Sequence, residues 1–204
     1  MSELTFEYKE KQSCLETYEW DNVWWEQTNI KDVPRVLYVG DSISVHTRRI
    51  ATGTAKGEFL FDGFATSKAV DNPYFADSVR IFGKQQGERC AVLFNNGLHG
   101  WHLEDETEYR HFYEQMICFF IKEFPNTPFF LLLTTYVADP EQNARVQVRN
   151  RVVCELAQKY ALPVIDLYSI IEANANLLSD GVHMQREGYQ LLANEIIQTI
   201  KDSK

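Results

Sequence analysis

Short apolar runs alternate with amphipathic helical patterns after Pro34, and this alternation narrows the possible folds more than any other property of the sequence. Several runs are hydrophobic at consecutive positions, as expected of strands covered by helices on both faces. The expected strands are Arg35–Val39, Glu58–Phe61, Cys90–Asn95, Pro128–Thr134 and Pro163–Leu167. Alternating strands and helices favour a parallel sheet with right-handed crossovers, so we predict an α/β three-layer sandwich.

The helices between the later strands carry their own signals. Apolar side chains recur at three- and four-residue steps from Phe112 to Phe124, behind an acidic first turn at Glu104–Glu106. Asp139-Pro140 is typical of a helix N-cap followed by the first helical residue. The apolar stripe expected on that helix comprises Ala144, Val148, Val152 and Leu156, and that of the last helix Tyr189, Leu192, Ile196 and Ile200. In such a fold a site is expected beyond the carboxyl ends of the strands.

The chain of 204 residues suits one compact domain, and 45% of its residues are hydrophobic. Residues 1–34 differ in character, because they combine polar residues with Trp20, Trp24 and Trp25 and end at Pro34. We expect them to form an extension that packs across a domain of residues 35–204.

Charge and composition exclude several classes of partner. The formal net charge is −9 and the sequence pI about 5.1, which disfavours binding to nucleic acids or to anionic membranes. The start of the chain lacks the apolar core of a signal peptide, and the four cysteines form no C-x-x-C pair. We therefore expect reduced thiols and a cytoplasmic location. Neither a metal nor a cofactor is expected, because no cluster of potential ligands has zinc-like spacing.

The first strand runs directly into Gly40-Asp41-Ser42 and a helical stretch. A serine at such a turn presents its hydroxyl at the carboxyl end of the sheet, and its own N–H, at the helix N-terminus, can face a developing oxyanion. Gly40 permits the tight turn. On its own, the sequence Gly-Asp-Ser has an equally good structural interpretation, in which Asp41 or Ser42 caps the next helix.

A second candidate segment, Ser179-Asp180-Gly181-Val182-His183, precedes the last helix. A serine nucleophile needs a neutral imidazole to take its proton, and a carboxylate fixes the tautomer of that imidazole. An Asp three residues before a His can reach it within one turn of chain. This loop should return to the edge of the sheet that carries Ser42. We therefore predict a catalytic triad of Ser42, His183 and Asp180, although either segment alone also fits a helix cap.

The residues around this triad resemble a known family. Val-Gly-Asp-Ser after the first strand and Asp-Gly-Val-His before the last helix are similar to blocks I and V of the SGNH/GDSL hydrolases. The resemblance extends over about residues 35 to 200 and includes Val164–Tyr168 and Glu187–Tyr189. It implies a flavodoxin-like, five-stranded parallel sheet in the order 2-1-3-4-5, with helices on both faces. It also implies hydrolysis of carboxylic esters through an acyl-enzyme.

In that family two further blocks supply donors to the oxyanion. Block II is a glycine after the second strand, and Gly63 stands where its N–H could serve, although it also fits an ordinary turn. Block III usually reads Gly-x-Asn-Asp, whereas here His99 stands at the asparagine position. The run Phe94–Trp101 resembles the F-N-x-G-H-W block of the related PC-esterase group. This second resemblance favours Asn95 as the amide donor, with His99 as a second polar wall. The alternative is that His99 itself takes the role of the family's asparagine.

The function favoured by these residues is a serine esterase that removes short acyl groups, especially acetyl, from a carbohydrate or another small ester. Trp101, His102 and Tyr136 could flank a sugar. The alternative from another class is a catalytically silent carbohydrate-binding or scaffold protein, which the altered block III would suit. An α/β-hydrolase is disfavoured because its elbow requires glycine where Ser44 stands. A flavodoxin-like receiver or nucleotide-binding domain is disfavoured because the first strand is followed by Asp41 alone and by no glycine-rich phosphate loop.

Overall fold

The computed structural model describes residues 16, 18–85 and 87–203, so the expected extension of residues 1–34 lies partly outside the described residues. In chain order the elements are β1 (Asp21–Trp24), β2 (Arg35–Gly40), α1 (Ser42–Thr54), β3 (Leu60–Thr66), α2 (Phe75–Gly83), β4 (Ala91–Phe94), α3 (Glu106–Glu123), β5 (Phe129–Leu132), α4 (Pro140–Tyr160), β6 (Val164–Ile165), α5 (Leu167–Glu172), η1 (Ala175–Leu177) and α6 (Arg186–Asp202).

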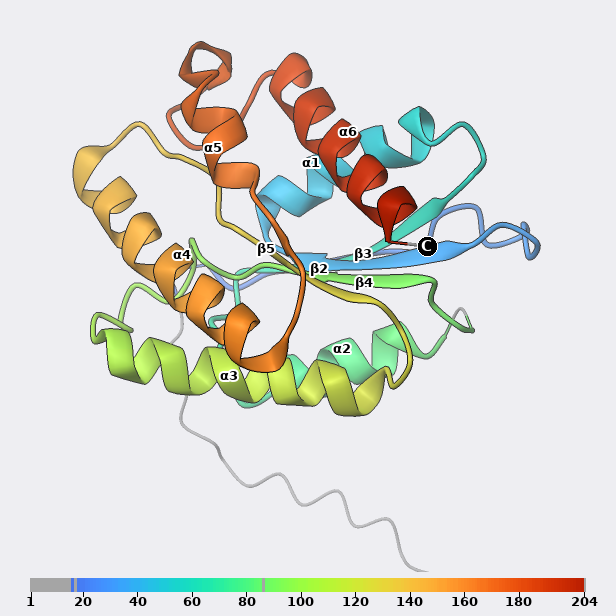
Figure 1. Cartoon of the computed structure of the whole chain (residues 1–204), viewed down its shortest axis with the longest axis horizontal. Helices are drawn as coiled ribbons and strands as arrows, with labels where there is room; N and C mark the ends of the chain where they lie inside the picture. The colour runs from blue at the N-terminus through green and yellow to red at the C-terminus, as the bar shows by residue number, and fades with distance from the viewer. Residues whose placement is uncertain (1–15, 17, 86, 204) are drawn as a thin grey trace, which may run out of the picture.

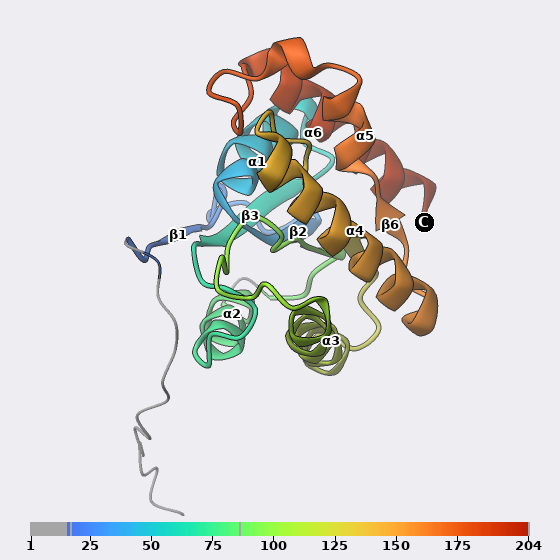
Figure 2. The ribbon, with the colours of Figure 1, turned by 90° about the vertical axis from the view of Figure 1, so that its left-hand side faces the viewer.

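The six strands of the described residues join one sheet in the order β1-β3-β2-β4-β5-β6. The five strands after Pro34 pair in parallel, which confirms the predicted order 2-1-3-4-5. The sixth strand, β1, was not predicted. It pairs antiparallel with β3 and closes one edge of the sheet, as Figure 2 shows.

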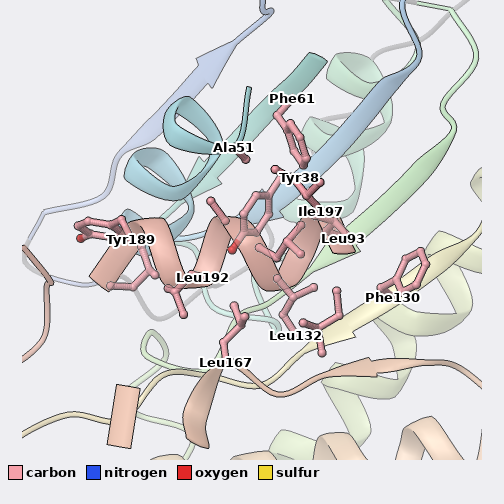
Figure 3. Packing of buried hydrophobic residues seen from close by; sticks show 14 of the residues in the cluster. Tyr38, Ala51, Phe61, Leu93, Phe130, Leu132, Leu167, Tyr189, Leu192 and Ile197 are labelled. Carbon is pink, nitrogen blue, oxygen red and sulfur yellow. The ribbon is translucent and has the colours of Figure 1, made fainter. Parts of the chain in front are cut away.

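Helices cover both faces of the sheet, so the predicted three-layer sandwich is confirmed. Figure 1 shows α1, α5 and α6 on one face and α2 and α3 on the other. Val152, Val153 and Leu156 of α4 pack in the core of this second face. Within β2, Val36 and Tyr38 point to the first face and Leu37 and Val39 to the second, and all four are buried. In Figure 3 side chains of α6 pack with those of the strands on the first face. Burial on both faces explains the continuously apolar strand sequences.

Aspartate side chains begin four of the helices. Asp41, Asp105, Asp139 and Asp166 each accept a hydrogen bond from a backbone N–H in the first turn of α1, α3, α4 and α5, respectively. The N-cap predicted at Asp139 is therefore confirmed. None of the helices in the described part of the chain combines the length and hydrophobicity that crossing a bilayer requires.

The second predicted strand was too short, and this error affects a predicted site residue. The strand was expected to end at Phe61, but β3 continues to Thr66, so Gly63 lies within it, opposite Tyr38 of β2. The expectation that Gly63 follows the strand and offers a free N–H beyond it is therefore wrong. Asp62, which has the character of a turn residue, is instead fully buried and ion-paired.

Packing against α1 explains why position 63 is a glycine. A Cβ atom there would lie 2.3 Å from Cδ of Arg48. Arg48 is only 1% exposed, and its Nη2 donates to Oδ1 of Asn22 at 2.6 Å. Burial lowers the pKa of Arg48 to about 10, and the guanidinium lies 5.9 Å from the ring centroid of Trp24. Gly63 thus makes room for a buried cation that connects α1 to β1.

We predict that Gly63→Ala lowers the free energy of unfolding by about 1–3 kcal/mol, because the added methyl group overlaps Arg48. Gly53→Ala is the matched control, since a Cβ atom at Gly53 meets nothing within 4 Å and alanine is favoured in a helix. Urea unfolding monitored by circular dichroism measures both. Equal stability of the two variants would contradict this account of Gly63.

Candidate active site

Ser42 is the first residue of α1, directly after the turn from β2. Asp41 caps the helix, because its Oδ1 accepts the N–H of Ile43 at 2.9 Å, and the Ser42 hydroxyl is therefore not needed as a cap. At Gly40 a Cβ atom would lie 2.8 Å from Cβ of Ser44, so the turn requires glycine. The N–H of Ser42, in the first helical turn, has no acceptor within the helix.

The structure brings together the three side chains predicted to form the triad. Oγ of Ser42 lies 2.8 Å from Nε2 of His183. Nδ1 of the same imidazole lies 2.8 Å from Oδ2 of Asp180. Ser42 is 141 residues from His183 in sequence, so this contact depends on the whole fold.

Hydrogen bonds to Asp180 determine the tautomer of the imidazole. Its Oδ1 accepts the backbone N–H groups of His183 at 2.7 Å and of Val182 at 3.0 Å. The bonds from the backbone and ring of His183, followed by that from Val182, lower the pKa of Asp180 to about 2. An ionised carboxylate only accepts, so Nδ1 of His183 carries the hydrogen and Nε2 is free to accept that of the Ser42 hydroxyl.

The loop that carries Asp180 and His183 is braced from two directions. The N–H and Oγ of Ser179 both donate to the carbonyl of His183, at 2.7 and 2.9 Å. The N–H of Ala138, in the loop after β5, donates to the carbonyl of Gly181 at 2.7 Å. Gly181 has a φ of +89°, in the left-handed region that favours glycine. These bonds hold the acid and the base over the carboxyl edge of the sheet.

A pocket of about 620 Å³ opens beside the imidazole of His183. The ring of His46 forms part of its wall and lies 5.1 Å from the ring of Tyr189. Partial burial, and then the charges of His183 and of two neighbouring arginines, lower the pKa of His46. The other residues that line this pocket are Arg49, Ile50, Ser179, Asp180, Met184 and Arg186.

Asn95 does not point toward Ser42 as a free donor, and this prediction is corrected. Its Nδ2 donates to the carbonyl of Leu132 at 2.9 Å and to Oγ1 of Thr134 at 3.0 Å. Both amide hydrogens are thereby used in the interior, between β4 and the end of β5. Nδ2 of Asn96 is also engaged, because it donates to the carbonyl of Lys68 at 2.8 Å.

His99 lies in the loop after β4, and because β2 and β4 are parallel neighbours this loop is at the same edge of the sheet as Ser42. Burial raises the pKa of Asp41, whereas the nearby imidazoles of His99 and His183 act in the opposite direction. Only 15% of the His99 side chain is exposed.

Arg149 of α4 holds the loop that carries His99, and the sequence analysis missed it. Its guanidinium donates to four carbonyls, those of Gly97, His99, Gly100 and Leu103, at 2.6 to 3.1 Å. Burial lowers the pKa of Arg149, which is only 2% exposed. A cation between the apolar positions of an amphipathic helix is the sequence signal that could have revealed it.

Trp101 lies at a second pocket on this edge. The pocket measures about 710 Å³, and the guanidinium of Arg145 lies 5.0 Å from the centroid of the Trp101 ring. Its remaining lining residues are Glu104, Asp139, Glu141 and Gln142. His102, in contrast, pairs with Asp71 at 2.7 Å. Among the described residues, no group of three or more potential ligands is placed to hold a metal ion.

Comparisons with known proteins agree with this architecture. A protein of the lipolytic G-D-S-L family from Veillonella parvula superimposes with a TM-score of 0.67 at 16% identity, covering 81% of this chain and 97% of its own. The lipase/acylhydrolase from Enterococcus faecalis gives a TM-score of 0.64 at 20% identity, with 84% and 97% coverage. The acetyl xylan esterase AlAXEase gives 0.63 at 18% identity, with 81% and 98% coverage.

No protein-family model and no curated protein sequence matches the chain. The similarity therefore lies in the three-dimensional structure, and it extends over nearly the whole length of each of these proteins. The fold of this chain is that of the SGNH/GDSL hydrolases.

Proposed function

We propose that this protein is a serine carboxylester hydrolase of the SGNH/GDSL type, which acts through an acyl-enzyme. One observation carries the proposal: an unbroken hydrogen-bonded chain runs from Asp180 through His183 to Ser42. It lies at the carboxyl edge of a fold that the chain shares with lipases, acylhydrolases and esterases.

In the first half of the reaction, Oγ of Ser42 attacks the acyl carbon while Nε2 of His183 takes the hydroxyl proton. The resulting imidazolium is stabilised by the ionised Asp180 and gives its proton to the departing alkoxide. The ester C–O bond breaks, and the alcohol leaves. In the second half, His183 takes a proton from water, whose oxygen attacks the acyl-enzyme. His183 then returns the proton to Ser42, and the carboxylic acid is released.

The negative charge on the substrate oxygen needs donors that are in place before the reaction. The N–H of Ser42, in the first turn of α1, is one of them. We assign the second to the imidazole of His99, because Asn95 is engaged in the interior and Gly63 lies inside β3.

We further propose that the substrate carries a short acyl group, in particular an acetyl group on a carbohydrate. An acetyl xylan esterase is among the proteins that share the fold. The pocket at Trp101 offers an aromatic face that is 43% exposed, together with carboxylates that could accept hydrogen bonds from hydroxyl groups. Asp139, which lines this pocket, follows Ala138, and the N–H of Ala138 donates to the carbonyl of Gly181 in the loop of His183.

We predict that Ser42→Ala lowers kcat on 4-nitrophenyl acetate by about 10⁴-fold or more, because no other group can form the acyl-enzyme. Ser44→Ala is the matched control, since its hydroxyl bonds to the carbonyl of Asp41 at 2.6 Å and does not contact His183. Wild-type activity in Ser42→Ala would refute the proposal. If the unaltered protein were inactive but bound acetylated sugars, the carbohydrate-binding alternative would be favoured.

On the acidic side of the profile, activity should rise with pH through a single ionisation, because only the neutral imidazole of His183 can act as the base. The pKa of Asp180, lowered to about 2, keeps this carboxylate ionised over the working range. It should therefore add no second inflection between about pH 4 and 9. Rate profiles of kcat/KM measure this, with and without a chelator, which should change nothing. Two acidic inflections, or inhibition by the chelator, would contradict the mechanism.

The substrate proposal predicts that Trp101→Ala raises KM for an acetylated xylo-oligosaccharide about fivefold, through the loss of contact with the ring. Trp24→Ala removes an equally exposed indole from β1, outside the pocket, and should leave that KM unchanged. Acetate release, compared with butyrate and octanoate release from model esters, tests the acyl preference. Faster release of octanoate than acetate would exclude a short-chain esterase.

A further inference from the structure

The N-terminal segment contacts the loop that carries His99. Nδ1 of His99 lies 3.0 Å from each carboxylate oxygen of Glu16, 83 residues away in sequence. The N–H of Gly100 also donates to this carboxylate, at 3.2 Å. Glu16 is therefore held by two consecutive residues of the loop after β4.

Trp20, four residues after Glu16, is bound to the neighbouring loop after β3. The N–H of Trp20 donates to Oγ of Ser67 at 2.8 Å, and the N–H of Ser67 donates to the carbonyl of Trp20 at 3.1 Å. The Trp20 ring meets the His99 ring edge-on, with centroids 6.0 Å apart. The imidazole of His99 is thus held by a carboxylate and by an aromatic ring of the same segment.

The backbone of His99 is fixed as well, because its carbonyl accepts from Arg149 at 2.6 Å. With Nδ1 occupied by Glu16, Nε2 is the polar ring atom left for another partner. A carboxylate only accepts, so Nδ1 must carry a hydrogen. A ring that also donates from Nε2 is an imidazolium, and its positive charge attracts an oxyanion formed over Ser42.

We propose that Glu16 is a positioning residue for catalysis, which orients His99 so that its Nε2 donates to the substrate oxygen. This inference rests on the proposed ester hydrolysis. It makes Glu16, which precedes Ser42 by 26 residues in the sequence, a functional part of the site. Glu16 contacts no reacting atom and acts only through the imidazole, in the way that Asp180 acts through His183.

The test measures kcat and KM on 4-nitrophenyl acetate for Glu16→Ala, His99→Ala and the double variant. His99→Ala should lower kcat about 10²-fold, as the loss of an oxyanion donor does. Glu16→Ala should lower it about tenfold, as the loss of an orienting partner does. KM should change less than about twofold in each, because the interaction is made in the transition state. The double variant should equal His99→Ala within about twofold, since Glu16 acts through that ring.

Asp21→Ala is the matched control for a loosened segment. It removes a carboxylate of equal charge that pairs with Lys68 at 2.6 Å and also contacts Thr66. It leaves the contact with His99 intact, so kcat should stay within about twofold of the unaltered protein. Equal melting temperatures of Glu16→Ala and Asp21→Ala would exclude a difference in folding as the cause of a difference in kcat.

Two results would overturn the inference. If the double variant lost kcat by the product of the two single losses, Glu16 and His99 would act independently. A kcat for His99→Ala near that of the unaltered protein, with Ser42→Ala inactive, would reject the role of His99 and retain ester hydrolysis. If Ser42→Ala matched the unaltered protein, the proposed function itself would fail.

Discussion

The parallel pairing of β2 between β3 and β4 is the constraint on which the rest of the structure depends. Parallel neighbours end at the same edge of a sheet, so the loops after β2, β3 and β4 must meet there. Ser42 follows β2, His99 follows β4, and the loop of His183 returns to the same edge after β6 and α5. Ser42, His99 and His183 each lie within a few residues of a strand or helix end, so short loops are sufficient to place them at this edge.

Two buried arginines show how this fold uses a cation in its interior. Arg149 donates to four carbonyls, so its hydrogen-bonding capacity is largely satisfied and it connects four positions of the loop it binds. Arg48 donates to Asn22 and lies near Trp24, while its Nε and Nη1 have no partner among the described residues. The first arrangement fixes a loop at the site; the second fills the space beside Gly63 and joins the edge strand to α1.

Local signals predicted the central features, and contacts between distant residues account for the errors. The strand-turn-helix around Ser42 and the three-residue spacing of Asp180 and His183 are local, and the structure brings these residues together. Asn95 was misplaced because its partner Thr134 is 39 residues away, and no sequence window contains both. The contact of Glu16 with His99 spans 83 residues, so no short stretch of the sequence indicates it. On α4 the expected stripe included Ala144, which is exposed, because buried polar side chains occupy part of the inner face.

The two edges of the sheet have a consequence for self-association. Unpaired N–H and C=O groups on a long edge strand are a template on which another chain can add a strand, and natural proteins keep such edges short or covered. Here the outer strands are β1, with four residues, and β6, with two. Behind β1 lies β3, seven residues long and buried throughout. Removal of the chain up to Trp24 would expose this apolar strand, so a shortened protein should tend to aggregate through sheet extension.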